Sequence, residues 1–221
     1  MSDGHAPAAR AFTRLAARTQ RSRPGALALA ELRIMLKGVT RWWYFIALAL
    51  VVVSLFVPLA AVRQFLAPMA MIWPLLHWSP MGTRELRHHT DGLLFSTPRP
   101  VARLLAAQWL AGAVLALAVA AGAIARFALS AEWGSLAALL VGVAFVPSLA
   151  IACGTWSGSA RLFEVIYLLL WNAGPMNRIP AIDFVGTTQP TSGPAAPIAF
   201  LALAAGLMCL AVLGRRRQLR R

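Results

Sequence analysis

Long apolar segments alternate with short polar ones along this chain. A bilayer core is crossed by about 20 apolar residues in helical conformation. By this criterion the pattern predicts six membrane-spanning helices, at residues 43–62, 65–80, 104–125, 135–153, 162–174 and 195–213. The fifth of these segments is shorter than a span requires. The second contains three prolines, so we expect a kinked helix whose freed carbonyls are hydrogen-bonded by neighbouring helices.

The connections between the predicted spans are of two kinds. Arg63 and Gln64 form only a very short turn between the first span and the second. Residues 175–194 form a much longer connection, which is rich in proline and glycine but also holds the apolar Phe184 and Val185. We expect an outer re-entrant or surface-lying segment here, which membrane proteins tolerate where protein or a watery cavity covers the backbone.

Small residues recur at a spacing of four in the third predicted span, at Gly112, Ala116 and Ala120. Such a stripe lets another helix approach closely. The alternative is that it only reflects an alanine-rich composition.

The chain begins with two polar elements. Residues 1–24 carry several arginines and little apolar periodicity, and we expect them to be a basic cytoplasmic tail. Residues 25–41 place Leu29, Leu32 and Leu36 at helical spacing, with charged residues elsewhere around the wheel. A helix of that kind lies in the plane of the membrane interface. We therefore expect an interfacial amphipathic helix before the first span.

Residues 81–103 interrupt the apolar pattern with a cluster of ionisable groups. A central Arg or Asp in a membrane helix costs roughly 2.5–3.5 kcal/mol, so this segment lies in water or at the membrane surface. Thr83 can cap a short helix that has Glu85 in its first turn, and Pro98 and Pro100 would end it. The pattern is typical of an amphipathic helix at the membrane face, and equally of a solvated connector whose charges fix the topology.

Composition gives the class of protein. The 221 residues are 59% hydrophobic and 13% charged, with a mean hydropathy of +0.68, whereas soluble domains are about 25% charged. We therefore predict an all-α, polytopic integral membrane protein with a six-span domain at residues 42–213. The net charge of +14 would suggest nucleic acid in a soluble chain. Here the basic residues flank apolar spans, so we expect contacts with membrane lipid and none with nucleic acid.

The basic residues also predict an orientation. All 21 Lys and Arg except Arg63, Arg126 and Arg178 lie on the side of both termini and of residues 81–103. By the positive-inside rule that side is cytoplasmic, including the basic tail at residues 214–221. The abundance of Ala and Arg is typical of a GC-rich bacterial genome, so we expect the bacterial cytoplasmic (inner) membrane.

Catalytic and metal sites find little support. A phosphate-binding loop needs a lysine, and the single lysine, Lys37, is followed by glycine rather than by Ser or Thr. No pattern of His, Cys and acidic residues has the spacing of a metal site. Cys153 and Cys209 both lie in apolar segments, where small packing residues are expected. We expect no enzymatic activity, cofactor or metal in this chain.

One acidic residue, Glu164, is expected inside a predicted span, and such residues are functional candidates. Arg161 precedes it by three residues on the same helical face, so a structural ion pair is the favoured interpretation. The functional alternative is an intramembrane polar site that Glu164 forms with Asn172.

The segment after the second span has a recognisable motif, RE....T..LL.STP.....LL....L. With the interfacial helix and six spans around it, this layout resembles the membrane subunits of type-2 ATP-binding-cassette exporters. Residues 162–186 are also similar to a segment of some bacterial permeases. The histidines at 88 and 89 stand where that motif has a smaller or more polar pair. The residues that match the motif are Arg84, Glu85, Thr90, Leu93, Leu94, Ser96, Thr97, Pro98, Leu104, Leu105 and Leu110.

The resemblance implies a permease that forms half of a transport pathway, as a homodimer or with a second permease. A soluble ATPase subunit would bind ATP and Mg²⁺ in place of this chain. The helix after the second span would dock on that ATPase, with polar contacts from Arg84, Glu85 and Asp91. Residues 25–41 would be the elbow helix. Leu93 and Leu94 would then be the apolar anchor and Pro98 a stiff link to the third span. Thr90 would be a further coupling residue.

Two other classes of protein use the same topology. A polytopic membrane enzyme would need converging polar groups, for which the candidates are His77, His88, His89 and Asp91. A membrane scaffold or sensor without transport activity would use the basic tails to bind partners or anionic lipid. A shortened relative of a longer permease is a further possibility within the transporter class.

Overall fold

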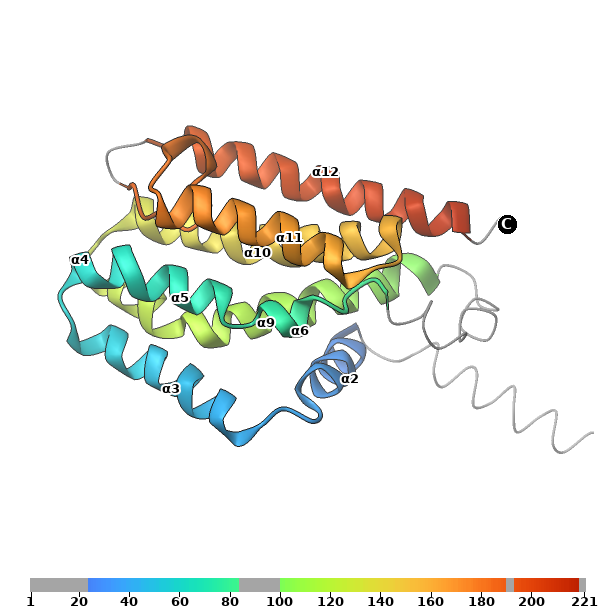
Figure 1. Ribbon diagram of the computed structural model, residues 1–221, viewed down its shortest axis with the longest axis horizontal. Helices are drawn as coiled ribbons and strands as arrows, with labels where there is room; N and C mark the ends of the chain where they lie inside the picture. Colours follow the sequence, from blue (N-terminus) through green and yellow to red (C-terminus); the bar gives the residue numbers. More distant parts are fainter. Residues whose placement is uncertain (1–23, 84–99, 190–192, 219–221) are drawn as a thin grey trace, which may run out of the picture.

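The structure is a computed structural model that describes residues 24–83, 100–189 and 193–218, and all regular elements in these ranges are helical (Figure 1). The long helices run side by side in one bundle, which the helix at the start of the described chain crosses at a steep angle. The elements are α2 (Pro24–Leu36), α3 (Arg41–Phe56), α4 (Leu59–Ala61), the π-helical turn η1 (Val62–Leu66), α5 (Ala67–Ile72), α6 (Leu75–Trp78), α9 (Pro100–Leu129), α10 (Trp133–Ser157), α11 (Ala160–Trp171), the π-helical turn η2 (Asn172–Met176), the 3-10 turn η3 (Pro180–Ile182) and α12 (Ala195–Gln218).

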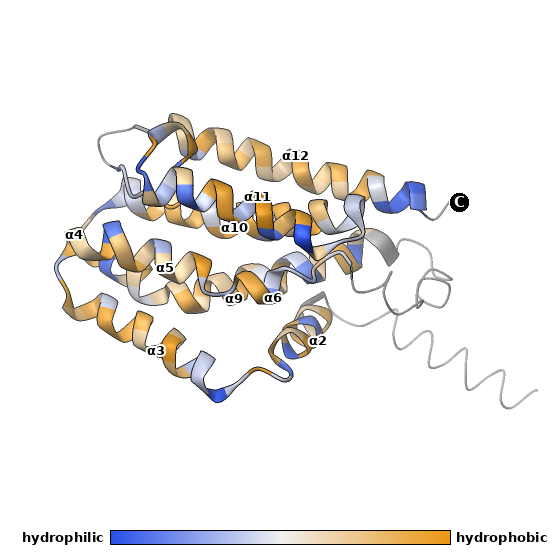
Figure 2. Ribbon diagram, viewed as in Figure 1, coloured by the Kyte–Doolittle hydropathy of each residue, from blue (hydrophilic) through white to orange (hydrophobic). Residues whose placement is uncertain are grey.

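The described helices confirm the all-α class, and several of them are long and apolar enough for a polytopic membrane protein. Four helical runs are long and apolar enough to cross a membrane, and a fifth is possible if α2 and α3, bent by 113°, count as one broken span. Apolar residues dominate these helices, and polar residues gather mostly at their ends (Figure 2). The four runs are Leu59–Trp78, Ala102–Leu129, Trp133–Ser157 and Ala195–Gln218.

The predicted turn between the first two spans is wrong. The chain turns at Val57 and Pro58, which have extended backbone angles, and α3 ends at Phe56. Proline disfavours helix in the residue before it, so Pro58 explains the position of the turn. Arg63 and Gln64 instead lie in η1, inside the second helical run. Their polarity resembled that of a loop, but Arg63 is held by an ion pair with Glu132 at 2.6 Å.

The second run is kinked and hydrogen-bonded by its neighbours, as its prolines predict. The helix breaks between α5 and α6 at Trp73 and Pro74, which leaves carbonyls of the last turn of α5 without helical donors. The Tyr167 hydroxyl of α11 donates to the Met71 carbonyl at 2.7 Å. The Trp171 indole donates to the Pro68 carbonyl at 2.9 Å.

Helix α10 lies at the centre of the bundle and packs against α9, α11 and α12. The small-residue stripe of α9 faces this interior, because Ala116 and Ala120 are fully buried. A Cβ atom on Gly112 would lie 3.0 Å from Pro147 of α10. The stripe therefore provides close helix packing and is more than a compositional feature.

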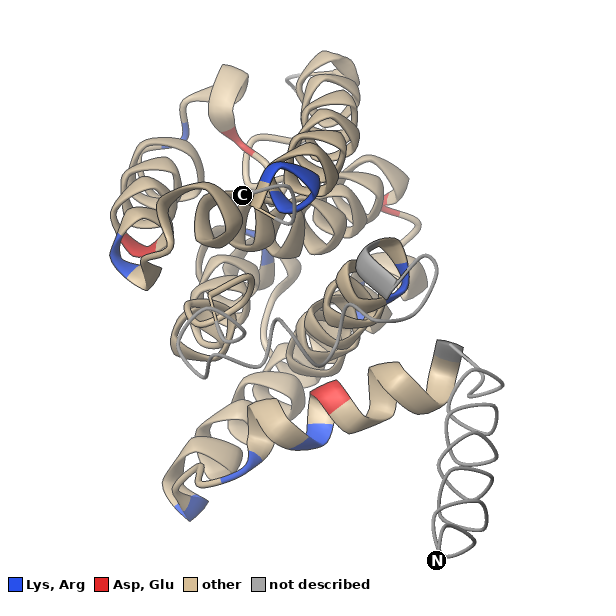
Figure 3. Cartoon of the chain, turned by 90° about the vertical axis from the view of Figure 1, so that its right-hand side faces the viewer, with Lys and Arg blue, Asp and Glu red and all other residues tan. Residues whose placement is uncertain are grey.

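Two sets of polar contacts mark the two ends of the bundle. At one end Arg63 pairs with Glu132, and Arg178 donates to Gln64 at 3.0 Å. We call the other end the Gly82 end. There the Gln218 amide donates to the Thr155 carbonyl at 2.7 Å, and the Ser79 hydroxyl donates to the Glu164 carboxylate. Figure 3 looks along the bundle from the Gly82 end and shows the basic last turn of α12 there.

Helix α2 is shorter than the interfacial helix we predicted, because it ends at Leu36 before a turn with Gly38 at φ +84°. It packs against α9. Met35 is buried, whereas Leu29 is half exposed.

Candidate functional site

The predicted coupling residues Arg84, Glu85, Thr90, Asp91, Leu93, Leu94 and Pro98 lie outside the described residues. The same holds for His88 and His89. The structure describes both places where this segment joins the bundle, namely residues 81–83 after α6 and the start of α9. We call residues 81–83 the stem.

The stem is buried. Met81 and Thr83 are no more than 1% exposed, and Gly82 adopts φ +75°, a conformation that favours glycine. The Thr83 hydroxyl donates to the Pro80 carbonyl at 3.0 Å. Just before the stem, the indole of the fully buried Trp78 donates to the Gly112 carbonyl at 3.2 Å. The segment 84–99 therefore starts from a well-packed point.

Helix α10 touches the stem backbone to backbone. A Cβ atom on Gly154 would overlap the Met81 carbonyl oxygen and lie 3.1 Å from the Cα atom of Gly82. A Cβ atom on Gly82 would in turn lie 2.7 Å from the Ile151 carbonyl oxygen. Neither glycine can be replaced without moving one backbone away from the other.

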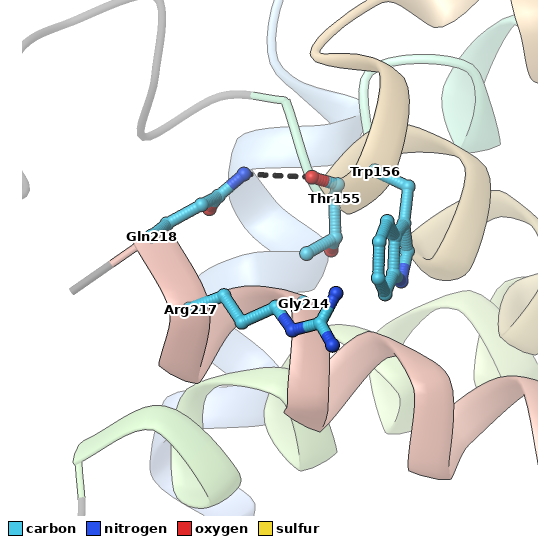
Figure 4. A pocket seen from close by; sticks show the side chains of 5 residues that line it. All are labelled: Thr155, Trp156, Gly214, Arg217 and Gln218. Atoms are coloured by element: carbon cyan, nitrogen blue, oxygen red, sulfur yellow. Dashed lines mark hydrogen bonds between the residues drawn. The ribbon is translucent and has the colours of Figure 1, made fainter. Parts of the chain in front are cut away.

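Helix α12 holds the stem from another side through Arg215, which is only 2% exposed. Its guanidinium donates to the Gly82 carbonyl at 3.4 Å and to the Gln218 side chain at 3.3 Å. Gln218 also reaches the Thr155 carbonyl of α10 (Figure 4). A buried guanidinium is stable only where its donors are satisfied, so this arrangement ties the end of α12 to the stem. We call the stem, the end of α10 and the end of α12 the joint.

The expected ion pair between Arg161 and Glu164 is absent from the described residues. Arg161 is exposed in the first turn of α11, where Ser159 accepts a hydrogen bond from its backbone N–H. The Glu164 carboxylate instead accepts a hydrogen bond from the Ser79 hydroxyl, next to the stem. Sequence spacing placed Arg161 and Glu164 on one helical face, but Glu164 turns towards α6.

Asn172 is the second residue of the predicted polar site. It lies eight residues further along the chain than Glu164, about 12 Å at the rise of an α-helix. Its backbone carbonyl accepts from the Asn177 backbone at 2.9 Å, and its side-chain oxygen accepts from the Asn177 amide at 3.0 Å. These contacts close the π-helical turn η2.

Asp183, which lies in the long connection after η2, was not among the predicted site residues. Its carboxylate is buried and accepts hydrogen bonds of 2.7–3.1 Å from three backbone N–H groups and two hydroxyls. The next residue, Phe184, is fully buried against Phe145 and Tyr167. Asp183 therefore folds this connection onto the bundle. An Asp followed by Gly and Thr residues was the local signal for such a turn.

The described residues contain no group of three or more His, Cys, Asp and Glu side chains that could hold a metal ion. Family models, curated proteins and solved structures give no match to this chain. The joint is thus the best-defined candidate site, because it ties the stem to both α10 and α12.

Proposed function

We propose that this chain is the permease subunit of an ATP-binding-cassette exporter. It forms half of the transmembrane pathway, as a homodimer or with a second permease, and couples to a separate ATPase subunit that binds ATP and Mg²⁺. The observation that carries the proposal is the joint. The segment whose motif resembles a docking helix begins at a stem that contacts α10 backbone to backbone and accepts a hydrogen bond from the Arg215 side chain of α12.

Six crossings of the membrane are part of this proposal. In addition to the four long runs, we count α3, which runs from a contact of Trp43 with His77 to a bond of Val57 with Arg126, and the α11–η2 unit. The α11–η2 unit starts near Ser79 and is followed by Arg178, which bonds Gln64 at the other end. The distribution of basic residues then makes the Gly82 end cytoplasmic. Helix α2, which crosses the bundle, is the elbow, and residues 175–194 are the outer re-entrant segment.

The joint suggests how ATP hydrolysis moves the helices. Arg84, Glu85 and Asp91 contact the ATPase through polar groups, and Leu93 and Leu94 provide the apolar anchor. Closure of the ATPases pulls on this segment. The pull reaches the flanking α6 and α9, α10 through the packed backbones at Gly82 and Gly154, and α12 through the Arg215 side chain.

The test uses the double variant Glu85→Lys/Leu93→Asp. We expect it to lose co-purification with the ATPase and stimulation of ATP turnover, because it reverses a polar contact and puts a charge in the apolar anchor. The matched control is Asp3→Lys/Leu15→Asp, which makes the same two changes in the N-terminal tail and should bind normally. Normal binding and turnover by the first variant would disprove the docking assignment.

Failure of the docking test would favour the other two classes. A lipid-modifying activity without any ATPase would indicate the membrane enzyme, and a monomer that binds no ATPase would indicate the scaffold or sensor.

A further inference from the structure

An amphipathic groove lies at the Gly82 end between α10 and α12, on the outer side of the joint. Its floor is Trp156, in the last turn of α10, which is 51% exposed. The Trp156 indole donates to the Leu210 carbonyl of α12 at 2.9 Å, which fixes the ring in place. The guanidinium of Arg217 lies over the ring, 5.5 Å from its centroid (Figure 4).

Two cavities flank this stacked pair. The first has a volume of about 210 Å³ and lies between the polar ends of the two helices; it is lined by Thr155, Trp156, Gly214, Arg217 and Gln218. The second, of about 300 Å³, combines two guanidinium groups with an apolar wall; it is lined by Trp156, Leu210, Leu213, Arg216 and Arg217. The groove is therefore cationic at one end and apolar at the other.

The two exposed arginines of the groove differ from their neighbour Arg215. Arg215 is buried and bonded to the stem. Arg216 and Arg217 are exposed, and no acidic side chain among residues 24–83, 100–189 and 193–218 pairs with either of them. Within the part of the chain that the structure describes, their charges thus face no acid and are placed for an anionic ligand.

We propose that this groove binds one anionic phospholipid. The phosphate contacts Arg216 and Arg217, and an acyl chain lies along Leu213 and Leu210. These leucines precede Arg216 by three and six residues, so the apolar wall runs about 9 Å from the cationic end towards the middle of α12. Tryptophan and arginine at the end of a membrane helix are at the depth of the lipid headgroups.

The chemistry favours a lipid over other anions. A free phosphate would use only the guanidinium groups and would leave Leu210 and Leu213, both about half exposed, uncovered. A soluble acidic peptide would not reach a wall that continues into an apolar span. A neutral lipid would cover the apolar wall with its acyl chain, but it has no net negative charge to pair with the two arginines.

Gly214 makes the groove rigid. A Cβ atom at this position would lie 2.8 Å from the Trp156 indole nitrogen and 3.2 Å from the Thr155 side chain. Glycine therefore lets α12 approach α10 closely enough for the indole to bond Leu210. A site that is formed before the ligand arrives loses less entropy on binding.

The test measures binding of dioctanoyl phosphatidylglycerol to the full-length chain in a neutral detergent, with dioctanoyl phosphatidylcholine and inorganic phosphate as comparison ligands. The variant Arg216→Gln/Arg217→Gln should weaken binding of phosphatidylglycerol at least tenfold. The matched control is Arg220→Gln/Arg221→Gln, which removes the same charge from the same tail and should change the affinity less than threefold. Phosphatidylcholine and phosphate should bind at least tenfold more weakly than phosphatidylglycerol.

A second variant, Leu213→Glu, keeps both arginines and places a carboxylate in the exposed apolar wall. It should also weaken phosphatidylglycerol binding at least tenfold, and it decides the question if the double arginine variant is poorly folded. Equal losses in the two double arginine variants would overturn the proposal, because general attraction by the basic tail would then explain the binding. Equal binding of phosphatidylcholine or of phosphate would overturn it too.

Discussion

The backbone contact at Gly154 leads to a quantitative prediction. A Cβ atom here would overlap the Met81 carbonyl oxygen and come within 3.1 Å of the Gly82 Cα atom. Because both neighbours are backbone atoms, no change of rotamer relieves the overlap, and Gly154→Ala must move the stem from α10 by about 1 Å. Overpacking of this kind costs about 1–3 kcal/mol.

Replacing glycine by alanine also stabilises a helix, by about 1 kcal/mol, so the comparison needs a control. Gly206 lies in α12, and a Cβ atom there would have nothing within 4 Å. Gly206→Ala therefore has the same gain in propensity without the overlap. We expect the apparent Tm of Gly154→Ala in detergent to be lower than that of Gly206→Ala by roughly 2–12 °C, at about 2–4 °C per kcal/mol for a chain of this size.

The assay is thermal unfolding of the two variants, purified side by side and followed by loss of the monodisperse peak in size-exclusion chromatography. If Gly154→Ala melts at the same temperature as Gly206→Ala, the stem does not pack against α10 as described. The mechanical link from the docking segment to α10 would then be refuted.

Three further predictions concern the rest of the bundle. Asp183→Ala removes the acceptor of five hydrogen bonds and should destabilise the chain by about 2–4 kcal/mol and increase proteolysis of residues 175–194, whereas unchanged proteolysis would contradict the turn. Tyr167→Phe leaves the Met71 carbonyl without its donor and should cost about 1–3 kcal/mol, seen as a lower apparent Tm; an unchanged Tm would argue against this bond. A reporter that works only in the cytoplasm should be active when fused after Arg221, and a reporter that works only outside should be active when inserted near Ser192. The opposite pattern would contradict the proposed topology.

Hydropathy predicted most of the helices, because a long apolar segment in a membrane protein has few alternatives to a helix. It misplaced the first turn, because a local pattern gives no information about a partner far along the chain. Arg63 looks like a loop residue until Glu132, at the start of α10, is seen to pair with it. Pro58 was the better signal, since the effect of proline on its neighbour is local.

The joint was harder to predict than the helices. Gly82 and Gly154 are far apart in the sequence, and only the folded chain shows that their backbones meet. Arg215 looked like a member of the basic tail, yet it is buried and bonded to the stem. Residue spacing also suggested that Glu164 pairs with Arg161. That prediction was wrong, because spacing shows which residues share a helix face but not which neighbouring helix that face contacts.

The central claim is that this chain works with a separate ATPase, and the most direct measurement is what co-purifies with it. The tagged chain is extracted from its native membrane in a gentle detergent, and the bound proteins are identified and quantified. We predict a soluble ATPase in stoichiometric amount. Recovery of an intact, folded chain without any ATPase would contradict the proposed function.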